Sequence, residues 1–391
     1  MKRIAAYIFH PPFGDSEIER LVEAGRLAGI RDLVQILRDV GLKPTLLTPA
    51  RSDGSFPLSD LGLSLFETGG IESFDFGASL RNVIRQTRPH GFLYFGSGSG
   101  VLLSRDQVEG LRNFAAGDRG GAVFNNFYSC DFAAVSDATA LLDIALPRTD
   151  NPLGLALADA GVPCFALERS AETQFDLDTP IDLMILRESV RGGRSVRTLL
   201  EERDLSHPFL SRILEFLTDR SALVYLLGRV SPRTWADIED HIACRTGGAI
   251  EGRGMQSGVC SHLPVLQHVL RNDGPRAFFR SLADACDGAL IDTRPLLADS
   301  VSSSTGTRTH RFILPEAAVR FASDLLRPEA VSDPNWRSFT QAACEATIPV
   351  VLGGHSIVSG GLYLLADACW KGRDLDRRLH PQPFDPKKER S

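Results

Sequence analysis

The sequence predicts an α/β fold with two domains, each built around a mainly parallel sheet. Short apolar runs alternate along the chain with stretches whose apolar residues recur at helical spacing, the pattern of strand, helix and strand units. The length of 391 residues corresponds to about two domains of roughly 150 residues each. Hydrophobic residues make up 43% of the chain and charged residues 24%, which excludes a wholly disordered, collagen-like or coiled-coil protein.

The first domain is predicted over residues 1–190 and opens with a βαβ unit. Residues 3–9 form an apolar run, apolar residues then recur at helical spacing from Ile18 to Val40, and residues 43–49 form a second run. A helix that connects two such strands predicts a parallel sheet that is covered on both faces, and therefore a three-layer domain.

Capping residues mark where the helices of this domain begin. A Ser, Thr or Asp side chain can accept from the free amides of the first turn, and Pro favours that turn. The expected helix starts are Ser16 or Asp15, Ser104 with Gln107, and Thr179 with Pro180 and Asp182. Further strands are expected at residues 91–96, 121–126 and 162–168.

A second α/β domain is predicted over residues 205–371. The boundary is placed in the charged stretch 188–204, which contains a Gly pair. Strands are expected at residues 222–230, 288–294 and 348–354, and a helix at residues 275–286. Residues 372–391 form a polar, Pro-rich tail, which we expect to fray.

Charge and cysteine content exclude several classes of protein. The net charge is −6 and the basic residues are scattered, so no nucleic-acid surface is predicted. No apolar run reaches the roughly 18 residues that a membrane span needs. The seven cysteines are odd in number, widely spaced and without a Cys-x-x-Cys pair, which favours a reducing, cytoplasmic location.

Two carboxylates stand just before a capped helix. Asp176 and Asp178 lie two residues apart, so in an extended segment they point the same way. Carboxylate oxygens and nucleotide phosphates are the ligands that Mg²⁺ prefers. The alternative is that Asp178 is only part of an acidic helix entry.

The string Phe175-Asp176-Leu177-Asp178-Thr179-Pro180-Ile181-Asp182-Leu183 resembles a known family motif. It is similar to the closing motif of the molybdenum-cofactor guanylyltransferase-like nucleotidyltransferases and the phospholactate guanylyltransferases. Residues 91–111 and 150–167 also resemble stretches of that family. The resemblance covers roughly residues 1–190 and implies a glycosyltransferase-A-like domain, similar to the nucleotide-diphospho-sugar transferases, that binds a nucleoside triphosphate with Mg²⁺. It implies that Asp178, with Asp176, ligates the metal.

The chain departs from this family at two places. The family opens with a Gly-rich loop that carries a basic residue, whereas this chain has His10-Pro11-Pro12-Phe13-Gly14-Asp15, and Pro offers no amide hydrogen to a phosphate. The family also has a metal-binding Asp at the end of its central strand, where this chain has Gly96-Ser97-Gly98.

Two polar loops follow predicted strands in the first domain. Gly96, Ser97, Gly98 and Ser99 can bring backbone amides to an anion, although the loop is not a complete dinucleotide fingerprint and a plain turn is the alternative. Polar side chains at a strand's carboxyl end line the crevice where open α/β sheets bind ligands. The second loop offers Asn125, Asn126, Ser129 and Asp131 as contacts to a nucleotide or acceptor, with Asp131 as a third candidate metal ligand, unless it is only an Asx-rich turn.

The second domain has its own polar groups at strand ends and loops. Arg253 lies among glycines, Arg294 ends a strand, and His355 follows another. Arg can clamp a phosphate and His can shuttle a proton near neutral pH. The alternative is that Arg294 and Asp292 form an internal ion pair and that residues 353–356 are a tight turn.

These observations predict a Mg²⁺-dependent nucleotidyltransferase-like enzyme. The phosphate of a small acceptor would attack the α-phosphorus of a nucleoside triphosphate and release pyrophosphate. The alternative is a degenerate scaffold that only binds a ligand or partner, with any chemistry in the second domain. Neither hypothesis involves nucleic acid or a membrane, and a homodimer is left open.

Overall fold

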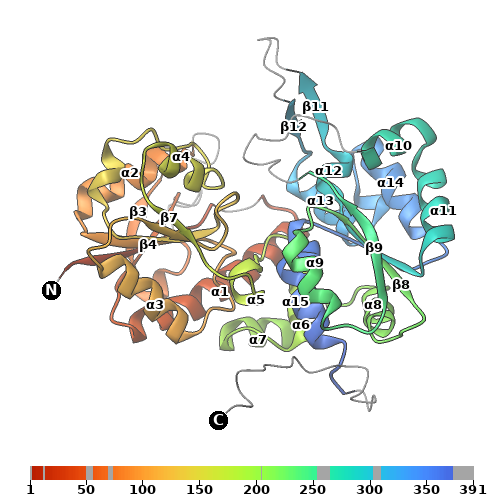
Figure 1. Cartoon of the computed structure of the whole chain (residues 1–391), viewed down its shortest axis with the longest axis horizontal. Coiled ribbons are helices and arrows are strands. Elements are labelled where there is room, and N and C mark those ends of the chain that lie inside the picture. Colours follow the sequence, from red (N-terminus) through yellow and green to blue (C-terminus); the bar gives the residue numbers. More distant parts are fainter. Residues whose placement is uncertain are drawn as a thin grey trace, which may run out of the picture.

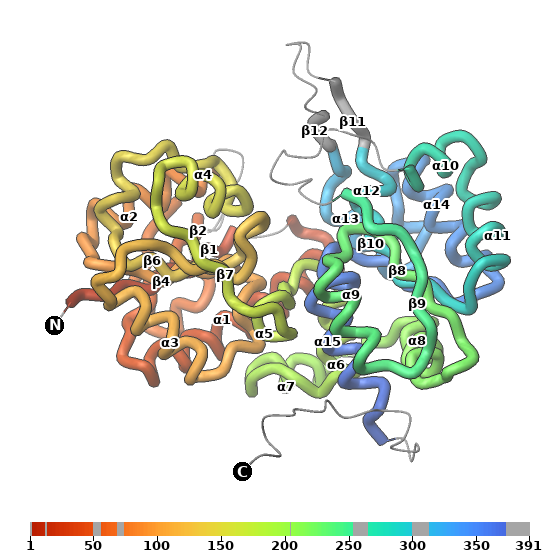
Figure 2. The backbone as a smooth tube through the Cα atoms, in the orientation of Figure 1, coloured from red at the N-terminus to blue at the C-terminus, as the bar shows by residue number. Residues whose placement is uncertain are grey.

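The computed structural model describes residues 2–11, 14–49, 56–68, 74–203, 205–252, 265–302 and 310–372. The chain forms two α/β units side by side, each around its own sheet, with α1, α6 and α15 between them (Figure 1 and Figure 2). The predicted fold class is confirmed. Arg253 and the tail at 373–391 lie outside the described residues.

The first sheet has seven strands in the order β3-β2-β1-β4-β6-β5-β7. Only β6 runs antiparallel to its neighbours, so the sheet is mainly parallel as predicted. The strands are β1 (Ile4–Phe9), β2 (Pro44–Thr48), β3 (Ser64–Glu67), β4 (Gly91–Gly96), β5 (Ala122–Phe124), β6 (Phe132–Val135) and β7 (Cys164–Ala166).

Helices cover both faces of this sheet. Along β1, Ala6 and Ile8 pack toward α1 (Glu17–Asp39) and α3 (Arg105–Ala116). The alternate residues Tyr7 and Phe9 belong to the cluster formed with α2 (Phe76–Thr87) and α4 (Leu153–Asp159). The period of two along a strand thus divides one apolar run between two cores, which makes the three layers.

Helix capping follows the sequence prediction closely. Ser16 caps α1, with Glu19 completing the capping box, which decides between Ser16 and Asp15. Ser104 and Gln107 cap α3 reciprocally. Thr179, Pro180 and Asp182 begin α6 (Pro180–Ser189).

The second sheet has four parallel strands in the order β13-β10-β8-β9. They are β8 (Leu223–Gly228), β9 (Arg245–Ile250), β10 (Gly288–Asp292) and β13 (Val350–Gly353), and β11 (Asp299–Ser302) pairs separately with β12 (His310–Ile313). One face packs on α8 (Leu210–Leu217) and α15 (Gly360–Ala368), the other on α10 (Val265–Asp273), α11 (Pro275–Ala285) and α14 (Pro334–Cys344). The remaining α-helices are α5 (Ala171–Gln174), α7 (Arg194–Glu201), α9 (Pro232–Glu239), α12 (Thr293–Leu297) and α13 (Ala317–Asp324).

Several short strands carry no clear sequence signal. β3 and β6 have only four residues each, too few for an alternating pattern to emerge. β9 has the sequence RTGGAI, in which two glycines disfavour a strand. Gly247 and Gly248 are required there because added Cβ atoms would lie 2.4 Å from the Tyr225 ring and 2.0 Å from the Leu226 carbonyl oxygen.

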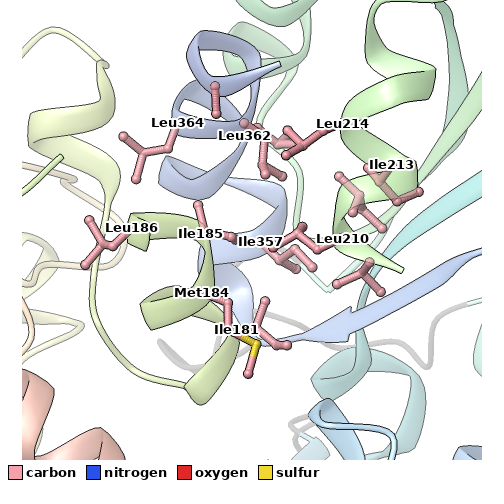
Figure 3. Packing of buried hydrophobic residues seen from close by; sticks show 14 of the residues in the cluster. Ile181, Met184, Ile185, Leu186, Leu210, Ile213, Leu214, Ile357, Leu362 and Leu364 are labelled. Carbon is pink, nitrogen blue, oxygen red and sulfur yellow. The ribbon is translucent and has the colours of Figure 1, made fainter. Parts of the chain in front are cut away.

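A single hydrophobic cluster joins the two halves of the chain. Figure 3 shows Ile181 and Ile185 of α6 packed among side chains of α8, α15 and the turn at 355–358. Val22 and Ala28 of α1 belong to the same cluster. The segment that closes the first unit therefore lies in the core of the second.

The fragment of residues 1–190 is expected to lack a cooperative unfolding transition. Without the second half, Ile181, Leu183 and Ile185 lose their covering side chains, and each fully buried apolar side chain contributes roughly 1.5–3 kcal/mol. Near-ultraviolet circular dichroism and thermal melting of the fragment, compared with the full chain, measure this. A monomeric fragment with a sharp transition would contradict it and would support residue 190 as a true domain limit.

Two further findings concern the described ranges only. No helix there is long and apolar enough to cross a lipid bilayer. Cys130, Cys164, Cys244, Cys286 and Cys344 are free thiols.

Candidate functional site

A cleft of about 500 Å³ lies between the two sheets. Its walls include Phe9 and Gly96 at the ends of β1 and β4, and Arg229 and Gly354, which directly follow β8 and β13. In the first sheet, β2 and β4 lie on opposite sides of β1; in the second, β9 and β10 lie on opposite sides of β8. The cleft therefore adjoins both topological switch points, the places where α/β sheets bind ligands.

Most of the predicted site residues line this one cleft. They are Gly96, Ser97, Gly98, Ser129, Asp131, Asp176, Asp178, Arg294 and His355. The carboxylates come from the first half of the chain, and Arg294 and His355 come from the second. Groups that the sequence suggests as two separate crevices thus face one cavity.

Three other predicted residues do not line the cleft but support its wall. The Ser99 hydroxyl donates within the turn, to the Gly96 carbonyl oxygen at 2.9 Å. Asn125 is buried, donates to Asp131 Oδ2 at 2.8 Å and accepts from the Asp131 amide at 2.9 Å. Asn126 accepts from the Tyr128 amide, an Asx turn. These three side chains therefore form hydrogen bonds within the loops.

The closing motif, residues 175–183, presents two carboxylates to the cleft. Residues 175–178 form no regular element; Leu177 points into the core, while Asp176 and Asp178 line the cavity. The Leu177 amide donates to the Gly98 carbonyl oxygen at 3.0 Å. Asp182 Oδ2 accepts from the Asp178 amide at 2.9 Å, which holds the backbone of the motif at the start of α6.

Four aspartates face the cleft among the described residues, and their charges repel one another. Burial and the charges of Asp178 and Asp131 raise the pKa of Asp176 well above its ordinary value. Burial, with the charges of Asp150 and Asp178, raises the pKa of Asp131 to about 8. Burial also raises the pKa of Asp150, although Tyr94 donates a hydrogen bond to it at 2.8 Å. A cation in the cleft would favour the ionised forms of all three.

Arg26 of α1 already partners one of these carboxylates. Its Nε donates to the Leu177 carbonyl oxygen at 2.8 Å, and a terminal nitrogen pairs with Asp178. Burial would raise the pKa of Asp178, but the Arg26 cation holds it below its ordinary value. Asp178 is therefore ionised at neutral pH without any bound metal.

Two arginines of the second half are held by buried carboxylates. Arg229 makes a bidentate pair with Asp292, at 2.5 and 2.9 Å. Arg294 makes another with Asp324, at 2.5 and 2.8 Å, and also donates to the Gly353 carbonyl oxygen. The suggested ion pair between Arg294 and Asp292 is therefore wrong. Asp292 pairs with Arg229, and Arg294 pairs with Asp324 of α13.

His355 begins the turn after β13 and lines the cleft. Burial and the adjacent Arg229 cation lower its pKa to about 4. The imidazole is therefore neutral at pH 7, and one ring nitrogen can accept a proton or a hydrogen bond.

The pH dependence of stability is expected to flatten in His355→Gln. Between pH 4 and 6.5 the unfolded chain binds a proton at His355 that the folded chain does not, so the free energy of unfolding rises with pH across this window. Removing the imidazole should reduce the loss of unfolding free energy between pH 7 and pH 4 by up to about 3 kcal/mol. Urea unfolding at several pH values measures this, with the exposed His268→Gln as control. Part of the slope should remain, because burial also lowers the pKa of His207 to about 4.

The donor set fits a Mg²⁺ ion that is completed by substrate. In the described ranges, no group of three or more His, Cys, Asp or Glu side chains is arranged to hold a metal. Mg²⁺ is usually bound through one or two carboxylates, with waters and substrate phosphates supplying the rest. Asp176 and Asp178 meet that requirement, and Asp176 Oδ1 is buried without a hydrogen-bond partner.

The structure adds cleft residues that sequence reasoning missed: Arg26, Arg148, Asp150, Arg229 and Arg320. Arg229 lies near the end of the strand predicted at residues 222–230 and directly follows the observed β8, so the rule that selected Arg294 at a strand end could have found it. Asp150 precedes Asn151-Pro152 and a helix, a weak turn signal. Arg26 and Arg320 sit inside helices, where only the tertiary structure shows what they face.

Similarity to solved structures is limited to part of the chain. A candidate nucleotide-diphospho-sugar transferase from Desulfovibrio desulfuricans G20 has 13% identity and a TM-score of 0.41, covering 52% of this chain and 96% of its own. A nucleotidyl transferase from Methanothermobacter thermautotroptrophicus has 16% identity and a TM-score of 0.39, covering 51% and 99%. A cytidylyltransferase from Leptospira borgpetersenii has 13% identity and a TM-score of 0.37, covering 52% and 94%. No family model matches the chain, and no curated protein matches its sequence.

Proposed function

We propose that this protein is a Mg²⁺-dependent nucleotidyltransferase that joins a nucleotide to a small phosphorylated acceptor and releases pyrophosphate. One observation supports this most strongly. A single cleft at the carboxyl ends of two mainly parallel sheets is lined by four aspartates from the first half of the chain and by five arginines, of which Arg229, Arg294 and Arg320 come from the second half. A metal–triphosphate complex carries both the cation that aspartates attract and the anion that arginines attract.

The residues of the cleft suggest a division of roles. Asp176 and Asp178 would hold Mg²⁺, which when bound neutralises phosphate charge. Arg26 orients Asp178 through their ion pair, and the turn at Gly96–Gly98 leaves room for the closing motif. An acceptor phosphate is already anionic at neutral pH, so the attack on the α-phosphorus needs little proton transfer. Catalysis would then depend on positioning and charge neutralisation.

Nucleotide binding is the direct test of this proposal. Thermal melting of the full chain with ATP, GTP, CTP or UTP, each with and without Mg²⁺, shows whether a nucleotide binds and which base is preferred. A ligand at 100 times its dissociation constant adds about 2.7 kcal/mol to the stability of the folded state. Stabilisation by one nucleotide only with Mg²⁺ would support the proposal, followed by assays of pyrophosphate release with phosphorylated acceptors. No stabilisation by any of the four would contradict it.

A binding scaffold without turnover is the second candidate. The Arg26–Asp178 ion pair favours it, because this cation occupies a carboxylate that the enzyme would need for metal. A scaffold would bind its ligand equally well with and without Mg²⁺. The magnesium dependence of the same melting experiment therefore separates the two functions.

A further inference from the structure

Arg320 on α13 lines the cleft from the second half of the chain. Its Nε donates to the Pro315 carbonyl oxygen at 3.0 Å, which fixes the direction of the guanidinium group. The guanidinium carbon lies 5.8 Å from the centre of the Phe321 ring, another lining side chain. Across the described part of the chain, its terminal nitrogens have neither a hydrogen-bond partner nor a carboxylate within salt-bridge distance.

The deeper arginines of the cleft differ from Arg320 in this respect. Arg26, Arg229 and Arg294 are paired with Asp178, Asp292 and Asp324 respectively. The remaining one, Arg148, is largely exposed and lies 3.4 Å from Asp75. Arg320 is thus a cation that is held in the cleft wall through Nε and whose terminal nitrogens have no partner among the described residues.

Arg320 lies near charges of both signs. Burial and the like charges of Arg294 and Arg26 lower its pKa to about 10, although the charges of Asp324 and Asp178 act in the opposite direction, so the group is still protonated at neutral pH. A bound anion would relieve this repulsion. The planar guanidinium matches two oxygens of a phosphoryl group.

We propose that Arg320 is the phosphate receptor of this cleft, binding a phosphoryl group of the substrate through its terminal nitrogens. Pro11 lines the same cleft after β1 and has no amide hydrogen, so that position cannot serve an anion with its backbone. The nearby aspartates disfavour a free anion but favour one that arrives with a divalent cation. That the anion is a phosphoryl group of the substrate rests on the proposed function. Anion binding itself requires no turnover.

Two variants test this assignment in the full-length chain. Arg320→Gln removes the charge. Arg337→Gln on α14 is the matched control, because the Arg337 Nε likewise donates to a nearby backbone oxygen, that of Val331, at 2.7 Å, and the side chain does not line the cleft. Inorganic pyrophosphate and inorganic phosphate are titrated with Mg²⁺ at constant ionic strength, by calorimetry and thermal melting.

We expect at least one of the two anions to bind the wild type and Arg337→Gln with equal affinity. The affinity of Arg320→Gln for the same anion should be at least tenfold lower. The melting temperature of unliganded Arg320→Gln should equal or exceed that of the wild type, because a repelled, half-buried cation is removed. The assignment would be overturned if all three proteins bound the anions with equal affinity or if the wild type bound neither anion. A clearly lower melting temperature of Arg320→Gln than of the wild type would also overturn it.

Nucleotide titrations identify the source of the phosphate. If Arg320→Gln weakens both nucleoside triphosphate and pyrophosphate binding, the residue holds the nucleotide tail. If only inorganic phosphate binding is weakened, the residue holds the acceptor phosphate. Arg320-dependent anion binding without any nucleotide binding would leave this assignment standing while the proposed function fails. Nucleotide turnover that is unchanged in Arg320→Gln would overturn the assignment alone.

Discussion

Asp178→Asn is expected to abolish Mg²⁺-dependent nucleotide binding and to lower kcat/KM at least about 100-fold, since even indirect partners of metal ligands contribute 10–100-fold. Asp178 is ionised without metal, because the Arg26 cation holds its pKa below the ordinary value. Asparagine keeps the shape but not the charge. Without this charge the metal loses a ligand, so any binding that remains should no longer respond to Mg²⁺. Calorimetric titration of nucleotide with and without Mg²⁺ measures both effects.

Asp60→Asn is the matched control for this experiment. Asp60 also pairs with an arginine of α1, Arg31, at 2.5 and 2.9 Å, and its side chain is 59% exposed against 51% for Asp178. It does not line the cleft. The control should therefore bind nucleotide like the wild type. If Asp178→Asn also binds nucleotide and Mg²⁺ unchanged, the role of this carboxylate as a metal ligand is refuted.

The largest effect on stability is expected for Gly360→Ala. A Cβ at position 360 would lie 2.2 Å from the backbone nitrogen and Cα of Phe175, and backbone atoms cannot turn away as a side chain can. Overpacking typically destabilises by 1–3 kcal/mol, and this contact lies at the upper end, at about 3 kcal/mol or more. The displaced segment carries Asp176, so nucleotide binding should weaken as well. Urea unfolding and the nucleotide titration together measure the two losses.

Gly110→Ala provides the opposite case. Gly110 lies inside α3, and a Cβ there would meet no atom within 4 Å. Alanine favours the helix over glycine by up to about 1 kcal/mol, so this variant should be slightly more stable than the wild type. If Gly360→Ala is as stable as Gly110→Ala, the close packing of α15 on the closing motif does not contribute to the stability of the protein as described.

Local patterns were sufficient to predict most of the elements. The capping box at Ser104 and the helix start at Thr179 were correctly predicted because their hydrogen bonds are completed within four residues. Buried parallel strands such as β4 and β10 stood out as apolar runs. β6 did not, because its four residues, FAAV, are placed by pairing with β4 and β5 and not by any pattern of their own.

Some residues of the candidate site were likewise predictable from local sequence, and others were identified only from the tertiary structure. Asp176 and Asp178 were found from sequence because their spacing by itself turns them to one side. That Arg229, Arg320 and His355 face those aspartates was decided only by the tertiary structure. The packing of α6 against α8 and α15 turns the carboxyl ends of the two sheets toward one cleft. Sequence periodicity records which face of an element is apolar, but not which distant element will cover it, and that covering is what brings these charges together.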